Sequence, residues 1–229
     1  MEIVPGVYGI DCNGRVWAYL VRTGSRWALI DTGFPDDLPL IEAELSAHDA
    51  KVSHIGQIVL THCHYDHMGT AAEIQDRAEV ETLAHRLDAP IIRGEATVAE
   101  PVLSDQEKKL MGQLEGGGPP DWSPARVDRE LEDGDTVRLG DDEALVVHVP
   151  GHTDGSIALY IASRGLLFTG DAVASFGRPI VGVFNVDPNR ARDSFKRLSQ
   201  LDFEAACFGH GPPITSGAAE IMRKVAEFL

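Results

Sequence analysis

Short apolar runs broken by turn residues fill the first part of the chain. Residues 7–10, 16–21 and 27–30 are rich in β-branched and aromatic side chains, and an Asn-Gly pair at 13–14 and a Gly-Ser pair at 24–25 separate these runs. Two-residue breaks of this kind are typical of β-hairpins. The pattern therefore predicts three antiparallel strands at the start of the chain.

Segments with helical spacing alternate with apolar runs in the rest of the chain. Leu38, Ile41 and Leu45, for example, recur at the spacing of one helix face. The pattern predicts helices over residues 36–50, 67–77, 189–201 and 216–229, with Ser216 as the N-cap of the last. It predicts strands over residues 55–60, 79–84, 136–139, 144–149, 156–162, 166–171 and 205–208. This order indicates two similar halves of mixed strands and helices, in a single domain over residues 1–229.

The segment from about 94 to 125 interrupts this order. An amphipathic stretch at 105–114 predicts a helix, and the Gly/Pro cluster at 116–120 ends any regular element. The segment is too short to carry a core of its own, so we expect a helical and loop excursion rather than a second domain. It is either a surface connection or a lid over the site, in which Met111 or Trp122 would touch a ligand.

The charge of the chain narrows the class of partner. The 229 residues carry a formal net charge of −16, and 43% of them are hydrophobic, as in a globular protein. An acidic surface repels nucleic acids and anionic membranes, so we expect a small-molecule substrate. Cys12, Cys63 and Cys207 form neither a CxxC pair nor a disulfide framework. The sequence has no signal-peptide pattern and no apolar run of about 20 residues, and the default expectation is a cytoplasmic protein.

Histidine and aspartate residues gather directly after the predicted strand at 55–60. Residues two apart in an extended segment point the same way, so His62 and His64 can bind one ion together. Asp66 and His67 follow where the chain turns into a helix, and they can face a second ion. Four ionisable groups in six residues would be costly to bury without a metal, and imidazole and carboxylate suit Zn²⁺. The motif therefore predicts a metal site.

Three shorter motifs also follow predicted strands. They are PGHT at 150–153, TGD at 169–171 and GH at 209–210, which contribute His152, Asp171 and His210. Each motif is ambiguous alone, because glycine followed by a polar residue is common in turns. Their occurrence together, in this order and after the first motif, favours one shared metal site.

Taken in order, these motifs resemble those of the metallo-β-lactamase superfamily. The resemblance includes THCHYDH at 61–67 and an early LIDTG at 29–33, and it extends over residues 3–215. It implies an α/β fold in the form of a four-layer αββα sandwich, two mixed β-sheets flanked by helices, with the site at the edge of the sheets.

The resemblance also implies a role for each motif residue. The implied ligands are His62, His64 and His152 for the first metal ion, Asp66, His67 and His210 for the second, and Asp171 as a bridge between them. Asp31 would support the metal-binding loop from behind the ligands. We expect two Zn²⁺ ions per chain, with iron or manganese as alternatives.

Two ions that share a carboxylate can also share a water molecule and lower its pKa from 15.7 toward about 7. The hydroxide formed between the metals would attack an ester, thioester, lactone or lactam carbonyl, and one metal would stabilise the oxyanion. Asp66 is the residue expected to orient the nucleophile and to pass its proton to the leaving group. The sequence thus predicts a metal-dependent hydrolase.

Other functions of the same motif set stay open. Persulfide dioxygenases resemble it but use a single iron ion, so a mononuclear iron oxidoreductase is the first alternative. A phosphodiesterase is a weaker one, because the acidic chain disfavours RNA. A non-catalytic metal-binding module is also weaker, because structural zinc sites are usually closed by four protein ligands.

The substrate is a separate question. Glyoxalase-II-like thioesterases carry a basic C-terminal region for glutathione, whereas only Arg223 and Lys224 are basic after His210. Lactonases often have a tyrosine shortly after the bridging aspartate, and residues 172–176 contain none. Aromatic residues of the loops suggest a partly apolar pocket, namely Phe34, Trp122, Phe176 and Phe184.

Overall fold

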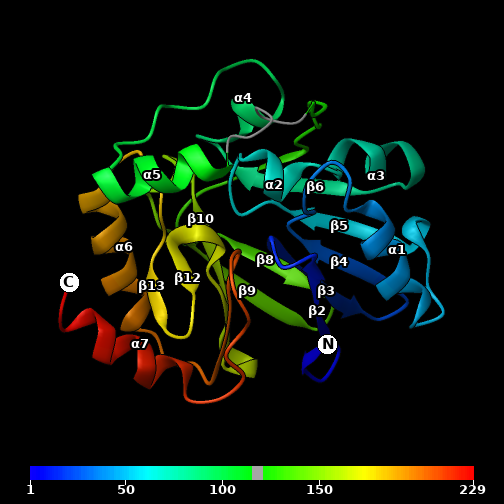
Figure 1. Cartoon of the computed structure of the whole chain (residues 1–229). Coiled ribbons are helices and arrows are strands. Elements are labelled where there is room, and N and C mark those ends of the chain that lie inside the picture. Colours follow the sequence, from blue (N-terminus) through cyan, green and yellow to red (C-terminus); the bar gives the residue numbers. More distant parts are fainter. Residues whose placement is uncertain (115–120) are drawn as a thin grey trace.

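The computed structural model describes residues 1–114 and 121–229, and the break predicted at 116–120 lies outside the described residues. Its elements form four layers, in which two β-sheets pack face to face between two layers of helices (Figure 1). The predicted αββα sandwich is therefore confirmed.

The first sheet contains seven strands in the order of the chain. These strands are β1 (Glu2–Val4), β2 (Val7–Cys12), β3 (Val16–Thr23), β4 (Arg26–Ile30), β5 (Ile55–Val59), β6 (Glu81–His85) and β7 (Arg129–Leu131). Strands β1 to β4 pair antiparallel, which confirms the predicted hairpins. Strands β4 to β7 pair parallel, so the sheet is mixed.

The second sheet has five strands in the order β14-β11-β10-β9-β8. These strands are β8 (Thr136–Leu139), β9 (Asp142–His148), β10 (Ile157–Ile161), β11 (Leu166–Phe168) and β14 (Ala205–Cys207). Only β11 and β14 pair parallel within it. A separate hairpin joins β12 (Val173–Ser175) to β13 (Pro179–Val181).

Both faces of the first sheet are buried, which explains its side-chain pattern. In β3, Ala18 and Leu20 pack toward the helices, while Tyr19 and Val21 pack toward the second sheet. Successive side chains of a strand point to opposite faces, so a strand that is buried on both faces is apolar throughout. This is why residues 16–21 lack the alternation of a half-exposed strand.

Helices cover the outer face of each sheet. The described helices are α1 (Leu38–Ser46), α2 (Tyr65–Met68), α3 (Ala71–Arg77), α4 (Ala89–Ile92), α5 (Asp105–Leu114), α6 (Pro188–Ser199) and α7 (Ala218–Ala226). Short 3-10 turns occupy Val52–His54, Ala162–Arg164 and Gly170–Ala172. Helices α1 and α3 pack on the first sheet, and α6 and α7 pack on the second (Figure 1). Among the described residues, no helix has the length and apolarity that a membrane crossing requires.

Two helix predictions need correction. The helix predicted over 67–77 is two helices, because α2 ends at Met68 and Thr70, with a φ of −98° and a ψ of 1°, precedes α3. Gly69 lies between them against the backbone of Pro35, whose nitrogen would be 2.4 Å from an added Cβ atom. The prediction of Ser216 as an N-cap is wrong. Gly217 occupies that position, with a φ of +66° in the left-handed region that glycine adopts without strain.

The strand directions bring several loops to one edge of the sandwich. Strand β5 lies between two parallel neighbours of the first sheet. In the second sheet, β9, β11 and β14 run in the same direction, because β10 is antiparallel to both β9 and β11 and β14 is parallel to β11. The loops that follow these strands carry the predicted metal ligands.

Candidate metal centre

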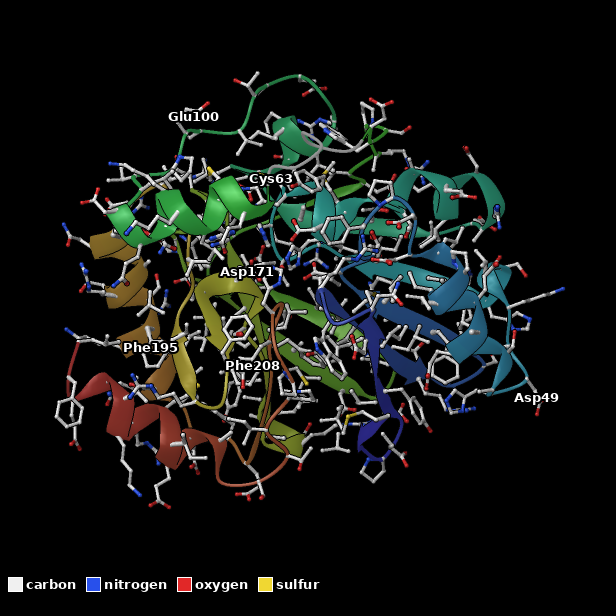
Figure 2. All side chains as sticks on the ribbon, in the orientation of Figure 1. Asp49, Cys63, Glu100, Asp171, Phe195 and Phe208 are labelled. Carbon is white, nitrogen blue, oxygen red and sulfur yellow. The ribbon has the colours of Figure 1, made fainter. Side chains whose placement is uncertain are left out.

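The structure brings together all seven residues that the motifs single out. Their donor atoms form three overlapping groups, each within 4.8 Å, which are His62, His64 and His152; His62, His67 and Asp171; and Asp66, His67 and His210. Asp171 lies in the 3-10 turn that follows β11, and its label is near the centre of the view in Figure 2. Four of the seven residues follow β5, namely His62, His64, Asp66 and His67. His152 follows β9, Asp171 follows β11 and His210 follows β14.

Two imidazoles of the first group, those of His152 and His62, are held by contacts on their far side. The Nδ1–H of His152 donates to the carbonyl of Val183 at 3.0 Å, and this turns Nε2 of His152 toward Nδ1 of His64, 2.9 Å away. Nδ1 of His62 lies 3.1 Å from the hydroxyl of Thr61. One nitrogen of each of these rings is thus free to face the centre of the group.

Asp31 lies behind the ligand loop. One of its carboxylate oxygens accepts the backbone N–H of Thr61 at 2.7 Å. The other accepts the Thr61 hydroxyl at 2.7 Å and the Nδ1–H of His67 at 2.8 Å. Asp31 is only 2% exposed and adopts a φ of +55°. The buried carboxylate therefore fixes the orientation of the His67 ring, so that its Nε2 points away from Asp31.

Asp171 lies at the centre of the site. Its oxygens are 3.1 Å from Nε2 of His210, 3.4 Å from Nε2 of His67 and 3.6 Å from Nε2 of His152. Asp66 approaches from the open side, with Oδ2 at 3.3 Å from Nε2 of His210 and 3.7 Å from Nε2 of His67. Asp171 thus lies close to His152 of the first donor group and to His67 and His210 of the third. These two groups, which share no residue, are called the outer groups.

Burial keeps the imidazoles of the first group neutral. It lowers the pKa of His62 and of His64, and it lowers the pKa of His152 to about 4. The neighbouring imidazoles lower the pKa of His62 and His152 further. A metal ligand must present an unprotonated nitrogen, so this environment suits metal binding.

The group of Asp66, His67 and His210, together with Asp171, has mixed charges. Burial lowers the pKa of His67 and of His210, but the nearby carboxylates outweigh it, and the pKa of His210 rises to about 10. Burial raises the pKa of Asp66 and of Asp171, but the imidazoles outweigh it, and the pKa of Asp66 falls to about 2. A divalent cation would compete with the imidazole protons for the same carboxylates.

Buried polar atoms show that this donor set fits a metal. Among the described residues, buried side-chain atoms without a hydrogen-bond partner include Nε2 of His62, Nε2 of His67 and Oδ1 of Asp171. All three atoms belong to the middle group, and such atoms are costly unless something binds them. Gly209 leaves room there, because a Cβ atom at this position would lie 2.0 Å from Oδ1 of Asp171.

A further buried carboxylate, Asp88, did not emerge from the sequence motifs. It follows β6, is 1% exposed, and accepts the N–H of Cys63 at 3.0 Å. It also accepts the hydroxyl of Thr153 at 2.7 Å and the N–H of Gly155 at 2.8 Å. Asp88 therefore ties the loop of the first two histidines to the loop of His152.

The four loop aromatics lie in different surroundings. Phe34 and Trp122 pack against the core beneath the first sheet's helices, and Phe34 lies 5.7 Å from the ring of Tyr65. Phe176 is 63% exposed. The backbone of Phe184 adopts a φ of +58° and donates its N–H to Glu107. A pocket formed by these residues therefore stays a prediction.

Curated relatives cover most of the chain. "Probable metallo-hydrolase YflN" of Bacillus subtilis is 29% identical over 93% of this chain and 87% of its own length. "Acyl-coenzyme A thioesterase MBLAC2" of Gallus gallus is 31% identical over 71% of this chain and 59% of its own length. A "Hydroxyacylglutathione hydrolase" of Cereibacter sphaeroides is 27% identical over 88% of this chain and 64% of its own length. This chain spans less than two thirds of the last two proteins.

Solved structures share the fold. The "metallo-beta-lactamase family protein TTHA1429" from Thermus thermophilus matches with a TM-score of 0.75 and 22% identity, over 99% of this chain and 80% of that one. "TTHA1623 in a di-iron-bound form" matches with a TM-score of 0.68 and 30% identity, over 95% and 96%. The family model described as "Metallo-beta-lactamase superfamily" matches residues 13–210, a span that begins before Asp31 and ends on His210. With its ordered motifs, its sandwich fold and its cluster of histidines and aspartates, the chain belongs to the metallo-beta-lactamase superfamily.

Proposed function

We propose that this metallo-hydrolase cleaves the thioester or ester bond of a small molecule with two metal ions bound by the seven clustered residues. The observation that carries the proposal is the overlap of the three donor groups. The two outer groups share no residue, and each offers three donors, while Asp171 lies within 3.6 Å of histidines from both. This arrangement supports two neighbouring ions with Asp171 between them.

The relatives support a thioester as the bond that is cleaved. Two of them are named as an acyl-coenzyme A thioesterase and a hydroxyacylglutathione hydrolase. We propose zinc as the metal, because neutral imidazoles and carboxylates suit it. Iron is the second candidate, since a structural relative with 30% identity is described in a di-iron-bound form. When bound, such ions would lower the pKa of water and polarise the substrate carbonyl.

Asp66 is the proposed catalytic residue. Its side chain is 17% exposed, more than those of the other carboxylates of the site, so it faces the side from which a substrate enters. During hydrolysis, the oxygen of water bonds to the carbonyl carbon, the C–S bond breaks, and sulfur leaves with the electron pair. Asp66 accepts a proton from the water at a carboxylate oxygen and delivers it to the sulfur, which gives a carboxylic acid and a thiol.

The test combines metal analysis with a substrate panel. Purified protein is loaded with zinc or iron, its metal content is measured, and hydrolysis of thioesters, esters, lactones, lactams and phosphodiesters is followed. We expect about two ions per chain and the highest kcat/KM on a thioester. Asp66→Ala should lower kcat by about 10²- to 10⁴-fold. His64→Ala should abolish activity, whereas His54→Ala, a histidine outside the site, should not.

Other outcomes would overturn the proposal. A content of one iron per chain, with oxygen uptake in the presence of a persulfide, would assign the protein to the dioxygenase class. Full thioesterase activity in a metal-loaded His64→Ala variant would exclude the proposed ligand set. Metal binding without turnover of any compound in the panel would favour a non-catalytic module.

A further inference from the structure

A groove lies on the side of the molecule where α5, α6, α7 and β13 meet (Figure 1). Its volume is about 1050 Å³, which is sufficient for a ligand larger than a simple acyl group. None of the seven candidate metal ligands lines it, so it is distinct from the site described above. The segment predicted as an excursion supplies one wall through residues 102–110.

The walls of the groove are mostly apolar and uncovered. The lining includes four exposed apolar residues, Val102, Leu110, Ile221 and Phe228. Their exposed fractions are 60%, 39%, 38% and 88%, respectively. The opposite wall includes Val181 of β13. Exposed apolar side chains that gather in one concave place mark a binding surface rather than ordinary surface variation.

Cationic groups border the groove although the chain is strongly acidic. Arg178, Arg192 and Lys224 line it, in a protein with a net charge of −16. Arg178 forms no ion pair with any described residue, and the side chain of Arg192 donates to neutral oxygens of its own helix. The acidic lining residue Glu107 is already engaged by Ser104 and by the N–H of Phe184. The two guanidinium groups are therefore available to an anion.

A buried polar side chain also lines the groove. Asn185 lines it and is only 5% exposed. Its Nδ2 donates to the carbonyl of Gly182, but its Oδ1 has no hydrogen-bond partner among the described residues. A buried acceptor of this kind requires a donor, such as the N–H of an amide.

One loop connects the groove to the metal centre. Val183 lines the groove, and its carbonyl accepts the Nδ1–H of His152. The N–H of Val102, on the α5 side of the groove, donates to the carbonyl of Asn185 in the same loop. The loop of residues 182–185 therefore contacts the metal centre, through the carbonyl of Val183, and also lines the groove.

We propose that the groove binds the thiol-carrier portion of the substrate, a pantetheine arm that ends in phosphate, as in coenzyme A. This assignment rests on the proposed thioester hydrolysis. The methyl and methylene groups of this arm suit the apolar walls, its amide N–H groups suit Oδ1 of Asn185, and its phosphates suit Arg178 and Arg192. Glutathione is also an anionic thiol with amide groups. It is smaller than a phosphorylated pantetheine arm, and it is more polar than the apolar walls of the groove require.

Two measurements test the assignment on the metal-loaded protein. Calorimetry with desulfo-coenzyme A, which lacks the thiol, measures binding that needs neither metal contact nor turnover. Kinetics then compare one acyl group carried by coenzyme A, by glutathione and by N-acetylcysteamine, which is a truncated arm. We expect desulfo-coenzyme A to bind and kcat/KM to be highest for the coenzyme A thioester.

Charge reversal locates the site. The double variant Arg178→Glu/Arg192→Glu should weaken desulfo-coenzyme A binding by about 10- to 100-fold. It should also reduce, by about the same factor, the ratio of kcat/KM for the coenzyme A thioester to kcat/KM for the N-acetylcysteamine thioester. Lys109→Glu removes a cation of α5 that does not line the groove, and it should retain both the binding and the preference.

Different results would overturn the groove assignment and the proposed thioester hydrolysis. Equal kcat/KM on all three carriers without desulfo-coenzyme A binding would overturn the groove assignment and leave thioester hydrolysis intact. A preference for the glutathione thioester would also overturn it. Arginine-dependent binding of desulfo-coenzyme A without any hydrolysis would support the groove and refute the proposed function. A stable dimer by sedimentation that loses self-association on charge reversal and does not bind the carrier would assign the groove to a second copy of the chain.

Discussion

Asp88 lies at the junction of two loops that carry candidate ligands. Its carboxylate accepts three hydrogen bonds, from Cys63, Thr153 and Gly155. Cys63 lies between His62 and His64 in the sequence, and Thr153 follows His152. The carboxylate therefore sets the distance between the two parts of the first donor group without contacting an ion.

Asp88→Asn should weaken metal binding by about 10- to 100-fold, because the amide NH₂ would face donors that need an acceptor. Competition with a chromophoric chelator measures the metal dissociation constant. Asp142→Asn is a matched control, since Asp142 also accepts hydrogen bonds, from Ser163 and Arg164, but lies at the end of β9 opposite to the loop that carries His152. Equal affinities for the two variants would refute a positioning role for Asp88.

His85 should make stability fall at mildly acidic pH. Burial first, then the charges of His148, whose stacked ring lies 4.2 Å away, and of Arg86, together lower its pKa to about 4 against the opposing effect of Asp133 and Asp135. The unfolded chain takes up this proton near the ordinary value of 6.5, but the folded chain only near 4. Lowering the pH between these values therefore favours the unfolded state.

The measurement for His85 is the free energy of unfolding at several pH values. His85→Asn keeps an acceptor for the N–H of Leu87 but cannot titrate. The difference in stability between the native protein and this variant should shrink as the pH falls from 6.5 to about 4. A constant difference over this range would contradict the prediction.

The residues that the sequence could reveal are those whose chemistry depends on local spacing. His62, His64 and His67 stand out because they lie within six positions of one another after an apolar run. Asp88 did not, because its partners are 25 to 67 positions away and two of them are backbone N–H groups. A carboxylate that binds backbone leaves no side-chain pattern in the sequence.

At the scale of elements, the turn that carries His152 is packed against the start of α6. The φ of Gly151 is +134°, and a Cβ atom there would lie 2.2 Å from the backbone nitrogen of Ala191. The carbonyl of Gly151 accepts the N–H of Asp187, which is the N-cap of α6. Turn and helix are thus in direct contact.

Gly151→Ala should destabilise the fold by about 2–4 kcal/mol, because it combines backbone strain with a clash against helix backbone. Metal affinity should also fall, since His152 is the next residue. Gly24→Ala is the control, because Gly24 also has a positive φ of +77° but has nothing within 4 Å of the added Cβ. Urea unfolding of both variants separates strain alone from strain with a clash, and equal losses would contradict this account.

Each described element of five or more residues was predictable, and so were the short strands β8, β11 and β14, whereas other short elements were not. The alternation of apolar runs and turns located β2 to β6, and helical spacing located α5 at Asp105–Leu114. Strands β1, β7, β12 and β13 have three residues each, too few to show a period. They form because the neighbouring strand supplies hydrogen bonds, which is tertiary information. The groove was missed for the same reason, since its walls come from four separated segments.

At the scale of the whole molecule, the candidate metal centre joins the two sheets. His62, His64, Asp66 and His67 follow a strand of the first sheet, whereas His152, Asp171 and His210 follow strands of the second. A metal ion that binds residues of both sets would connect the halves of the sandwich. It would also satisfy buried atoms that have no other hydrogen-bond partner, such as Nε2 of His62 and Oδ1 of Asp171.

Metal removal should therefore lower the stability of the whole fold and not only the activity. A ligand that binds only the folded state stabilises it by about 4 kcal/mol at a thousandfold excess over its dissociation constant. For a chain of this length this corresponds to a rise in Tm of roughly 10 °C. Differential scanning calorimetry of chelator-treated and reloaded protein measures the shift.

Variants from each sheet show whether the stabilisation depends on both. His64→Ala removes a donor that follows the first sheet, and His152→Ala removes one that follows the second. Either change should reduce the metal-dependent rise in Tm, because the first donor group needs residues from both sheets. His54→Ala should keep the full rise. If only one of the two site variants lost it, the metal would stabilise a single loop, and the sandwich would be held together by its apolar core alone.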